Sequence, residues 1–170
     1  MQATSTTGPT SQAAKILFSA VSDVLAARNW PCWEADGAQS AWKLLSAPPP
    51  GFGCATVEVT GEKPADNFFG ACPVEVTFAV KLSANRTPSP ANLPRQAPAL
   101  WEMADAVKAA LLALVLPREI VPEDPAVSLC YGGTAPFSPP AANPELVDAV
   151  QQTWTAELLP FLPPAEEDAI

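Results

Sequence analysis

The chain has 170 residues, carries a formal net charge of −9 and contains no histidine. This length favours a single domain, and an acidic chain is poorly suited to binding nucleic acid through its phosphates. The lack of histidine excludes Ser–His and Cys–His catalytic pairs, and neither a GxSxG nor a GxxxxGK[ST] motif occurs. The 21 prolines, roughly twice the average content of ~5%, indicate a compact core joined by stiff, irregular connections.

The N-terminal part predicts a short lead-in followed by a helix. Residues 1–10 are polar, without the basic start and apolar centre of a signal peptide. Ser11 is a candidate N-cap for a helix that runs to about Asn29, since apolar residues recur at intervals of three and four. Pro31 prevents the helix from continuing. The chain then has three tryptophans within thirteen residues, which favour sealing of the core edge over a base-stacking platform.

The clearest strand signal is Val74–Leu82, where apolar residues alternate with Glu75, Thr77, Ala79 and Lys81. Successive side chains of a strand point to opposite faces, so this strand is predicted to have one buried and one solvated face. Such a pattern is typical of antiparallel sheets. A shorter alternation over Ala55–Thr60 predicts a neighbouring strand.

Three long connections follow or separate these segments: Gly61–Pro73, the proline-rich Ser83–Pro98 and the proline-rich Thr134–Pro144. Long loops in compact domains are usually functional or disordered, and proline lowers the entropic cost of ordering an arm on a neighbour. The aromatic pair in the first loop is equally compatible with docking on a partner and with folding back over the sheet. The candidate subunit or partner contacts are Phe68, Phe69, Arg86, Arg95 and Phe137.

The C-terminal half predicts a second helix and two more strands. Apolar residues at helical spacing indicate a helix over about Ala99–Leu116, which Pro117 ends. A strand over Val127–Tyr131 is expected to close at Gly132–Gly133, and another is expected over Val150–Leu158. Residues 160–170 form an acidic, proline-bearing tail.

These segments predict one α+β domain over residues 11–159, in which two helices pack on one face of a four-stranded, mainly antiparallel sheet with long Pro-rich loops. The longest apolar run is far shorter than the ~20 residues needed to span a membrane, so no membrane association is expected. The cysteines lack CxxC spacing, and we expect all four to be buried free thiols in a reducing compartment. They are Cys32, Cys54, Cys72 and Cys130.

Catalytic, cofactor and metal sites are not predicted. Glu58 and Glu75 could face each other on the solvated side of the hairpin, and paired acids can act as general acid and base. Exposed strand glutamates are usually only solvated, so we expect no enzymatic role. The acidic Glu123–Asp124 and Glu166–Asp168 do not fit EF-hand spacing. A small intracellular ligand-binding or enzymatic α+β domain remains the alternative class to a structural protein.

The order of elements over Ser11–Leu159 resembles that of the small tail-terminator, or tail-completion, proteins of long-tailed phages and gene transfer agents. That order is a helix, a hairpin with a long loop, a proline-rich excursion, a helix that ends near a proline, and two closing strands. Related folds also serve as head–tail connector and tail-tube proteins, which is the alternative within this class.

The resemblance implies a structural virion protein without catalytic residues or cofactors. It would form a homohexameric ring at the head-proximal end of the tail, after assembly in the host cytoplasm. The ring would cap the tail tube, contact the tube protein and the head connector proteins, and let DNA pass without specific binding. The acidic composition is compatible with such a conduit.

Overall fold

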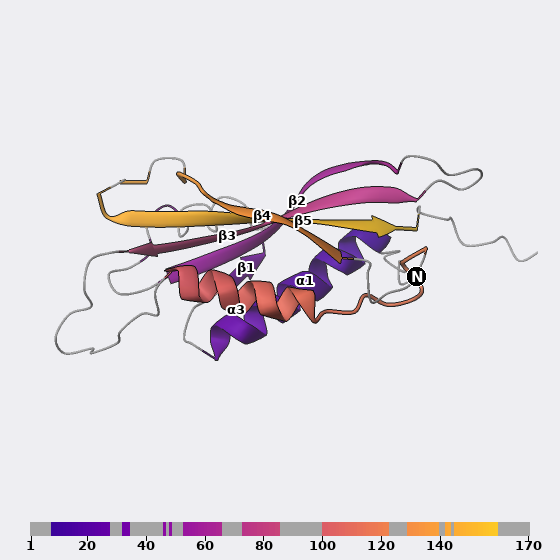
Figure 1. The fold of residues 1–170 in the computed structure, drawn as a ribbon, viewed down its shortest axis with the longest axis horizontal. Helices are drawn as coiled ribbons and strands as arrows, with labels where there is room; N and C mark the ends of the chain where they lie inside the picture. The colour runs from indigo at the N-terminus through magenta and orange to yellow at the C-terminus, as the bar shows by residue number, and fades with distance from the viewer. Residues whose placement is uncertain are drawn as a thin grey trace, which may run out of the picture.

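The computed structural model describes residues 8–27, 32–34, 46, 48, 53–65, 73–85, 100–122, 129–139, 142–143 and 145–159. For residues 32–34 only the backbone is described. The helices and strands, shown in Figure 1, are α1 (Pro9–Ala26), β1 (Cys32–Glu34), β2 (Gly53–Pro64), β3 (Val74–Asn85), α3 (Leu100–Leu112), β4 (Leu129–Pro136) and β5 (Val147–Leu158).

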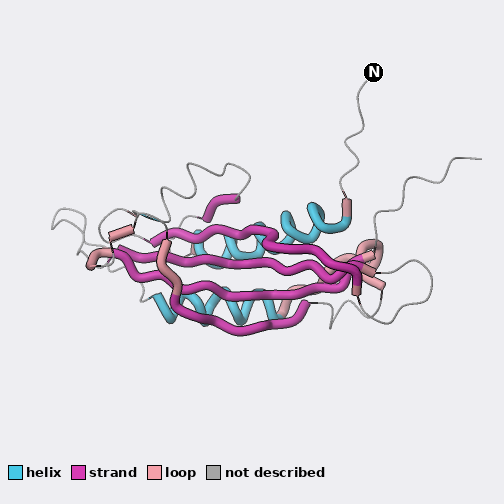
Figure 2. Tube along the Cα trace, turned by 90° about the horizontal axis from the view of Figure 1, so that it is seen from above, coloured by secondary structure: helices cyan, strands magenta, loops and turns pink. Residues whose placement is uncertain are grey.

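The strands form one sheet in the order β1-β2-β3-β5-β4. The four long strands β2, β3, β5 and β4 are antiparallel to their neighbours, whereas the short β1 pairs with β2 in parallel. Both helices pack on one face of this sheet, α1 behind β2 and α3 behind β3, β4 and β5 (Figure 2). This arrangement confirms the predicted α+β fold, and β1 is an addition that the sequence pattern did not indicate.

The core lies between the helices and the sheet. Each helix contributes a stripe of fully buried side chains, and the alternate residues of the strands face them. Trp154 and Phe78 lie opposite each other on β5 and β3, and both are completely buried. The stripe of α1 consists of Ala13, Leu17, Val21 and Leu25, and that of α3 of Met103, Ala104, Val107 and Leu111.

The ends of the helices differ slightly from the prediction. Helix α1 begins earlier than expected, because Gly8 is its N-cap and Pro9 occupies its first turn, where a missing N–H costs nothing. Helix α3 ends at Leu112, and the apolar residues that follow it are not helical. Leu116 and Ile120 in this segment are nevertheless buried, which explains why the apolar pattern continued past the end of the helix.

Two strands are longer than expected. β2 and β3 continue pairing to Pro64 and Val74, so the connection predicted over Gly61–Pro73 is partly strand; residues 66–72 lie outside the described part. β4 does not end at Gly132–Gly133, because these residues form a bulge between Tyr131 and Gly133 and pairing resumes to Pro136. Gly133 adopts a φ of 123°, which favours glycine.

Candidate functional site

The helix-free face of the sheet is the first candidate surface, and it is less exposed than the sequence predicts. It carries the side chains that alternate with the core residues. At the end of the sheet where β2 begins, Cys54, Thr56, Lys81 and Ser83 are all buried. Toward the other end, Thr77, Thr153 and Thr155 are only partly buried. The predicted solvated face is therefore wrong for about half of its length.

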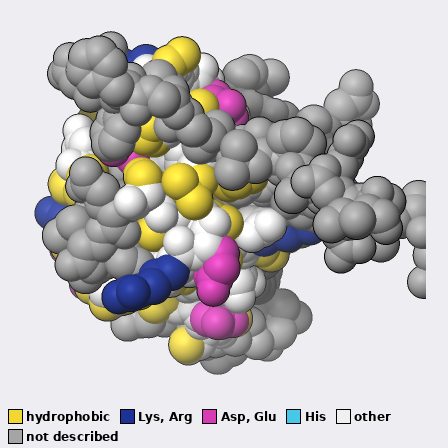
Figure 3. Space-filling view, turned by 90° about the vertical axis from the view of Figure 1, so that its right-hand side faces the viewer, with side chains coloured by type: hydrophobic (Ala, Val, Ile, Leu, Met, Phe, Trp, Pro, Cys, Tyr) yellow, Lys and Arg dark blue, Asp and Glu magenta, His cyan; other side chains and the backbone are white. Residues whose placement is uncertain are grey.

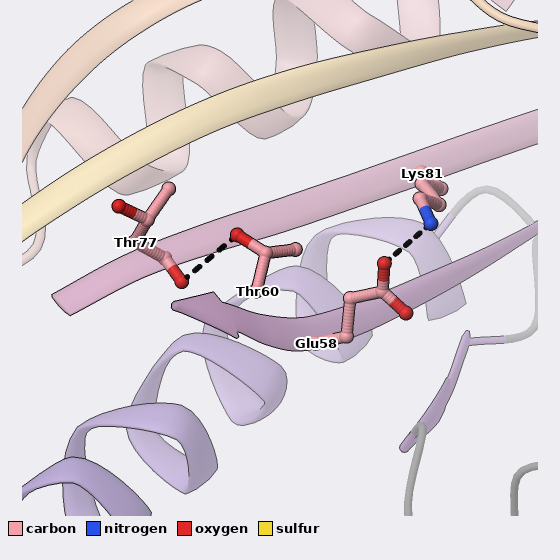
Figure 4. Close-up of polar contacts among 4 residues, drawn as sticks. All are labelled: Glu58, Thr60, Thr77 and Lys81. Carbon is pink, nitrogen blue, oxygen red and sulfur yellow. Dashed lines mark hydrogen bonds and ion pairs between the residues drawn. The ribbon is translucent and has the colours of Figure 1, made fainter. Parts of the chain in front are cut away.

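A buried ion pair lies at the centre of this face. The Lys81 ammonium on β3 binds the Glu58 carboxylate on β2, and the side chains retain only 10% and 15% of their exposure (Figure 4). The Lys81 nitrogen also lies 5.4 Å from the centroid of the Phe137 ring, within reach of a cation–π interaction. The desolvated lysine therefore has two partners that offset its loss of water.

Phe137 is the one candidate contact residue within the described part of the chain. Its amide donates a hydrogen bond to the Ala149 carbonyl oxygen at 3.0 Å, which extends the β4–β5 ladder by one residue. Its half-buried ring lies on the helix-free face over Lys81. The other candidate contacts, Phe68, Phe69, Arg86 and Arg95, lie outside the described residues.

The two glutamates of the hairpin do not face each other, so the carboxylate pair that the sequence allowed does not form. Glu58 lies opposite Ala79, and Glu75 lies opposite Lys63. Each carboxylate has its own lysine, because the Lys63 ammonium lies 3.4 Å from Glu75 and Lys81 binds Glu58. The two glutamates are far apart because β2 continues to Pro64, which pairs with Val74, so that Lys63 and not Glu58 comes opposite Glu75.

Cys54 is buried on the helix-free face beside Ser83, with 3.3 Å between sulfur and hydroxyl oxygen. Burial raises the pKa of the Cys54 thiol to about 11, although the hydrogen bond with Ser83 opposes this shift. Because the thiolate is the reactive form, this cysteine is protonated and unreactive at neutral pH. Cys130 is exposed, so the expectation that all four cysteines are buried is wrong. The side chains of Cys32 and Cys72 lie outside the described part.

We expect iodoacetamide at pH 8 to alkylate Cys130 and to leave Cys54 unmodified in the folded protein, because Cys130 is exposed, whereas Cys54 is buried and its pKa is raised. Peptide mapping by mass spectrometry measures both sites, and Cys54 should react once the chain is unfolded in urea. Equal labelling of both thiols in the folded protein would contradict the buried position of Cys54.

The exposed half of the helix-free face is lined with threonine. Thr77 and Thr155 are direct cross-strand partners, and the Thr60 hydroxyl in the β2 bulge donates to the Thr77 carbonyl oxygen at 3.2 Å (Figure 4). At the end of the sheet where β5 finishes, acidic, basic and hydrophobic side chains are intermixed among the described residues (Figure 3). This end therefore has no single-charge patch in view.

The β4 edge is the second candidate surface. None of its eight residues is charged. The amide of Phe137 points toward β5, and hydrogen-bonded residues alternate along an antiparallel strand. The backbone N–H and C=O groups of Ala135 therefore also point toward β5, while the backbone groups of Thr134 and Pro136 point away from the sheet. Proline is tolerated at such an edge position because no ladder bond is lost.

The opposite edge of the sheet is only partly covered. β1 pairs with Ala55–Val57 of β2. No strand in the described part of the chain lies beyond residues 58–64, and Val59 in this stretch is 42% exposed. Within the described part of the chain, the sheet thus has two edges without a neighbouring strand, β4 and the second half of β2.

No other recognisable site was found in the described ranges. They contain no group of three or more potential metal ligands, and none of their helices is long and apolar enough to cross a bilayer. No protein-family model matches the sequence, and a search of curated proteins gives no significant match.

Sequence reasoning missed the Lys81–Glu58 pair and both sheet edges. The signal for the pair was present, since opposite charges occupied predicted solvated positions of adjacent strands, but the pairing register of the two strands was not readable from the sequence. The lack of charge over residues 129–136 was a readable sign of an edge that does not repel a second strand.

Proposed function

We propose that the protein is the tail terminator of a long-tailed phage or gene transfer agent, a structural subunit that forms a ring on the tail tube. The observation that carries this proposal is the pair of open sheet edges at opposite sides of the subunit, β4 and the second half of β2. A ring requires two different, complementary surfaces on each copy, because head-to-tail contacts close into a ring when the rotation allows it.

The directions of these edges favour head-to-tail assembly. Four antiparallel strands lie between one side of the subunit and the other, so the edge strands β2 and β4 run in opposite directions. A rotation about a ring axis keeps each strand direction relative to that axis. β4 of one copy would therefore meet β2 of the next copy in an antiparallel orientation, and the sheet would continue across the joint through backbone hydrogen bonds.

The charges are compatible with this role. The uncharged β4 strand brings no like charge to the joint, while the net charge of −9 resides on the rest of the chain. An acidic ring interior would let DNA slide without adhering to it, since phosphate binding requires clustered basic residues. The partners in this proposal are the tail tube protein and the head connector.

The matched variants Thr134→Pro and Thr134→Ala test the joint. The backbone of Thr134 points away from β5, so proline removes an outward N–H and spares the ladder inside the subunit, while alanine keeps that N–H. Both variants remove the hydrogen bond between the Thr134 and Tyr131 hydroxyls. We expect native mass spectrometry to show rings for the wild type and Thr134→Ala, and no rings for Thr134→Pro.

Tube capping tests the function itself. The wild-type protein is expected to stop the elongation of tubes assembled from the tail tube protein of the same particle, as seen by electron microscopy, and Thr134→Pro is expected to lose this effect. Rings that form equally well with Thr134→Pro would contradict the proposed joint. Rings that never bind tube ends would contradict the terminator role.

A further inference from the structure

Helix α3 presents an apolar and charged stripe along one exposed flank. Trp101 and Leu112 at the two ends of the helix are 53% and 56% exposed, although large apolar side chains are usually buried. Asp105 and Lys108 lie between them on the same side, because residues three and four positions apart share a helix face. The Lys108 ammonium lies 4.3 Å from the centroid of the Tyr131 ring, so its long side chain lies toward β4.

The order of these four residues is self-complementary. The midpoint between Trp101 and Leu112 along the helix is also the midpoint between Asp105 and Lys108. We infer that a second copy of this chain packs on α3 with its own α3, antiparallel and related by a two-fold axis. Trp101 of each copy then contacts Leu112 of the other copy. Asp105 of each copy faces Lys108 of the other, so the contact contains two apolar pairs and two ion pairs.

The charges also select one register. If one α3 slides by three residues along the other, the two Asp105 side chains come opposite each other. If it slides by three residues in the other direction, the two Lys108 side chains do. Either displacement replaces two attractive pairs with a like-charge contact. A two-fold interface needs one patch that is complementary to itself, and this arrangement favours a second copy over an unrelated partner.

The inferred contact is independent of the proposed ring joint. The stripe lies on an exposed flank of α3, and the contact of Lys108 with the Tyr131 ring places this flank next to β4. The two-fold contact uses side chains of α3, whereas the ring joint uses outward backbone groups of β4 and of the second half of β2. Variants of the stripe therefore leave the ring joint intact, and the failure of one proposal is distinguishable from the failure of the other.

A charge-swap experiment tests the register. The charge-swap variants and Trp101→Ala are compared in the Thr134→Pro background, which is expected not to form rings, so that only the two-fold contact is measured. In a dimer of Asp105→Lys, the new lysine of each copy faces Lys108 of the other copy, which gives two lysine–lysine contacts. In a dimer of Lys108→Asp, the new aspartate of each copy faces Asp105 of the other copy, which gives two aspartate–aspartate contacts. We expect each variant alone to dimerise with a dissociation constant raised about tenfold, since each exposed pair changes from attraction to repulsion. A mixture of the two variants restores both attractive pairs, so native mass spectrometry should show the mixed dimer in excess over either homodimer.

The apolar contact is tested by Trp101→Ala, with Lys15→Ala on the exposed side of α1 as the matched control. Sedimentation equilibrium of the full chain is expected to show a dissociation constant raised at least about thirtyfold for Trp101→Ala, as for a tryptophan that an interface buries, and an unchanged constant for Lys15→Ala. Equal dimerisation of all these variants, or a random mixture in the charge swap, would overturn the inference. So would a wild-type chain without a two-fold contact at any concentration.

Discussion

Replacing Trp154 with alanine is expected to lower the free energy of unfolding by about 3–5 kcal/mol, which is the usual cost of removing a buried large aromatic side chain. Trp154 is completely buried, and its ring lies 5.1 Å from that of Tyr131 at a tilt of 56°. Its indole N–H donates to the Gln152 side-chain oxygen at 3.2 Å. The Gln152 amide donates in turn to the Ala104 carbonyl oxygen at 2.6 Å, which ties α3 to β5.

The loss therefore has two causes, a cavity in the core and a disturbed hydrogen bond between helix and sheet. Urea denaturation followed by circular dichroism measures it. Trp101→Ala is the matched control, because the same chemical change at a 53% exposed position is expected to cost less than about 0.5 kcal/mol when the protein is dilute enough to be monomeric. Equal losses for both variants would contradict the placement of Trp154 in the core.

Lys81→Met is expected to destabilise the fold by about 3–5 kcal/mol, because it leaves the Glu58 carboxylate desolvated without its partner. The double variant that combines Lys81→Met with Glu58→Gln removes both charges. It is expected to recover most of the lost free energy of unfolding, since a buried ion pair contributes little beyond compensating its own desolvation. Thermal and urea unfolding of the single and double variants complete the cycle.

The Lys63–Glu75 pair of the same hairpin is the natural control. The side chains of Lys63 and Glu75 are 66% and 34% exposed, and the Lys63 Nζ lies 3.4 Å from the Glu75 Oε1. Lys63→Met is therefore expected to lower the free energy of unfolding by at most about 1 kcal/mol. If Lys63→Met were as destabilising as Lys81→Met, burial would not be what distinguishes the two pairs.

The fold was predictable because both helices and the central strands have clear periodicity. Leu17, Val21 and Leu25 repeat every four residues, and Val76, Phe78, Val80 and Leu82 alternate without interruption. These patterns reflect burial on one side of each element, which is a local property that the sequence records directly.

The candidate surfaces were harder to predict because they depend on contacts between distant segments. The bulge at Thr60 brings Lys63 opposite Glu75, and no composition rule marked it. Gly132 and Gly133 indicated the end of a strand, but in an edge strand they instead allow a bulge. The burial of Lys81 follows from the position of Phe137, which is 56 residues away in the sequence.

The backbone of β4 also limits how firmly any neighbouring strand is held. Pro136 contributes no outward donor, and the bulge after Tyr131 interrupts the regular row of outward groups. Only a few hydrogen bonds are therefore available for each neighbour, and a single contact between two copies would dissociate readily. In a closed ring every copy would be held at two edges at once, and simultaneous contacts bind much more tightly than either contact alone. Wrongly joined chains would therefore separate before closure, while complete rings would persist.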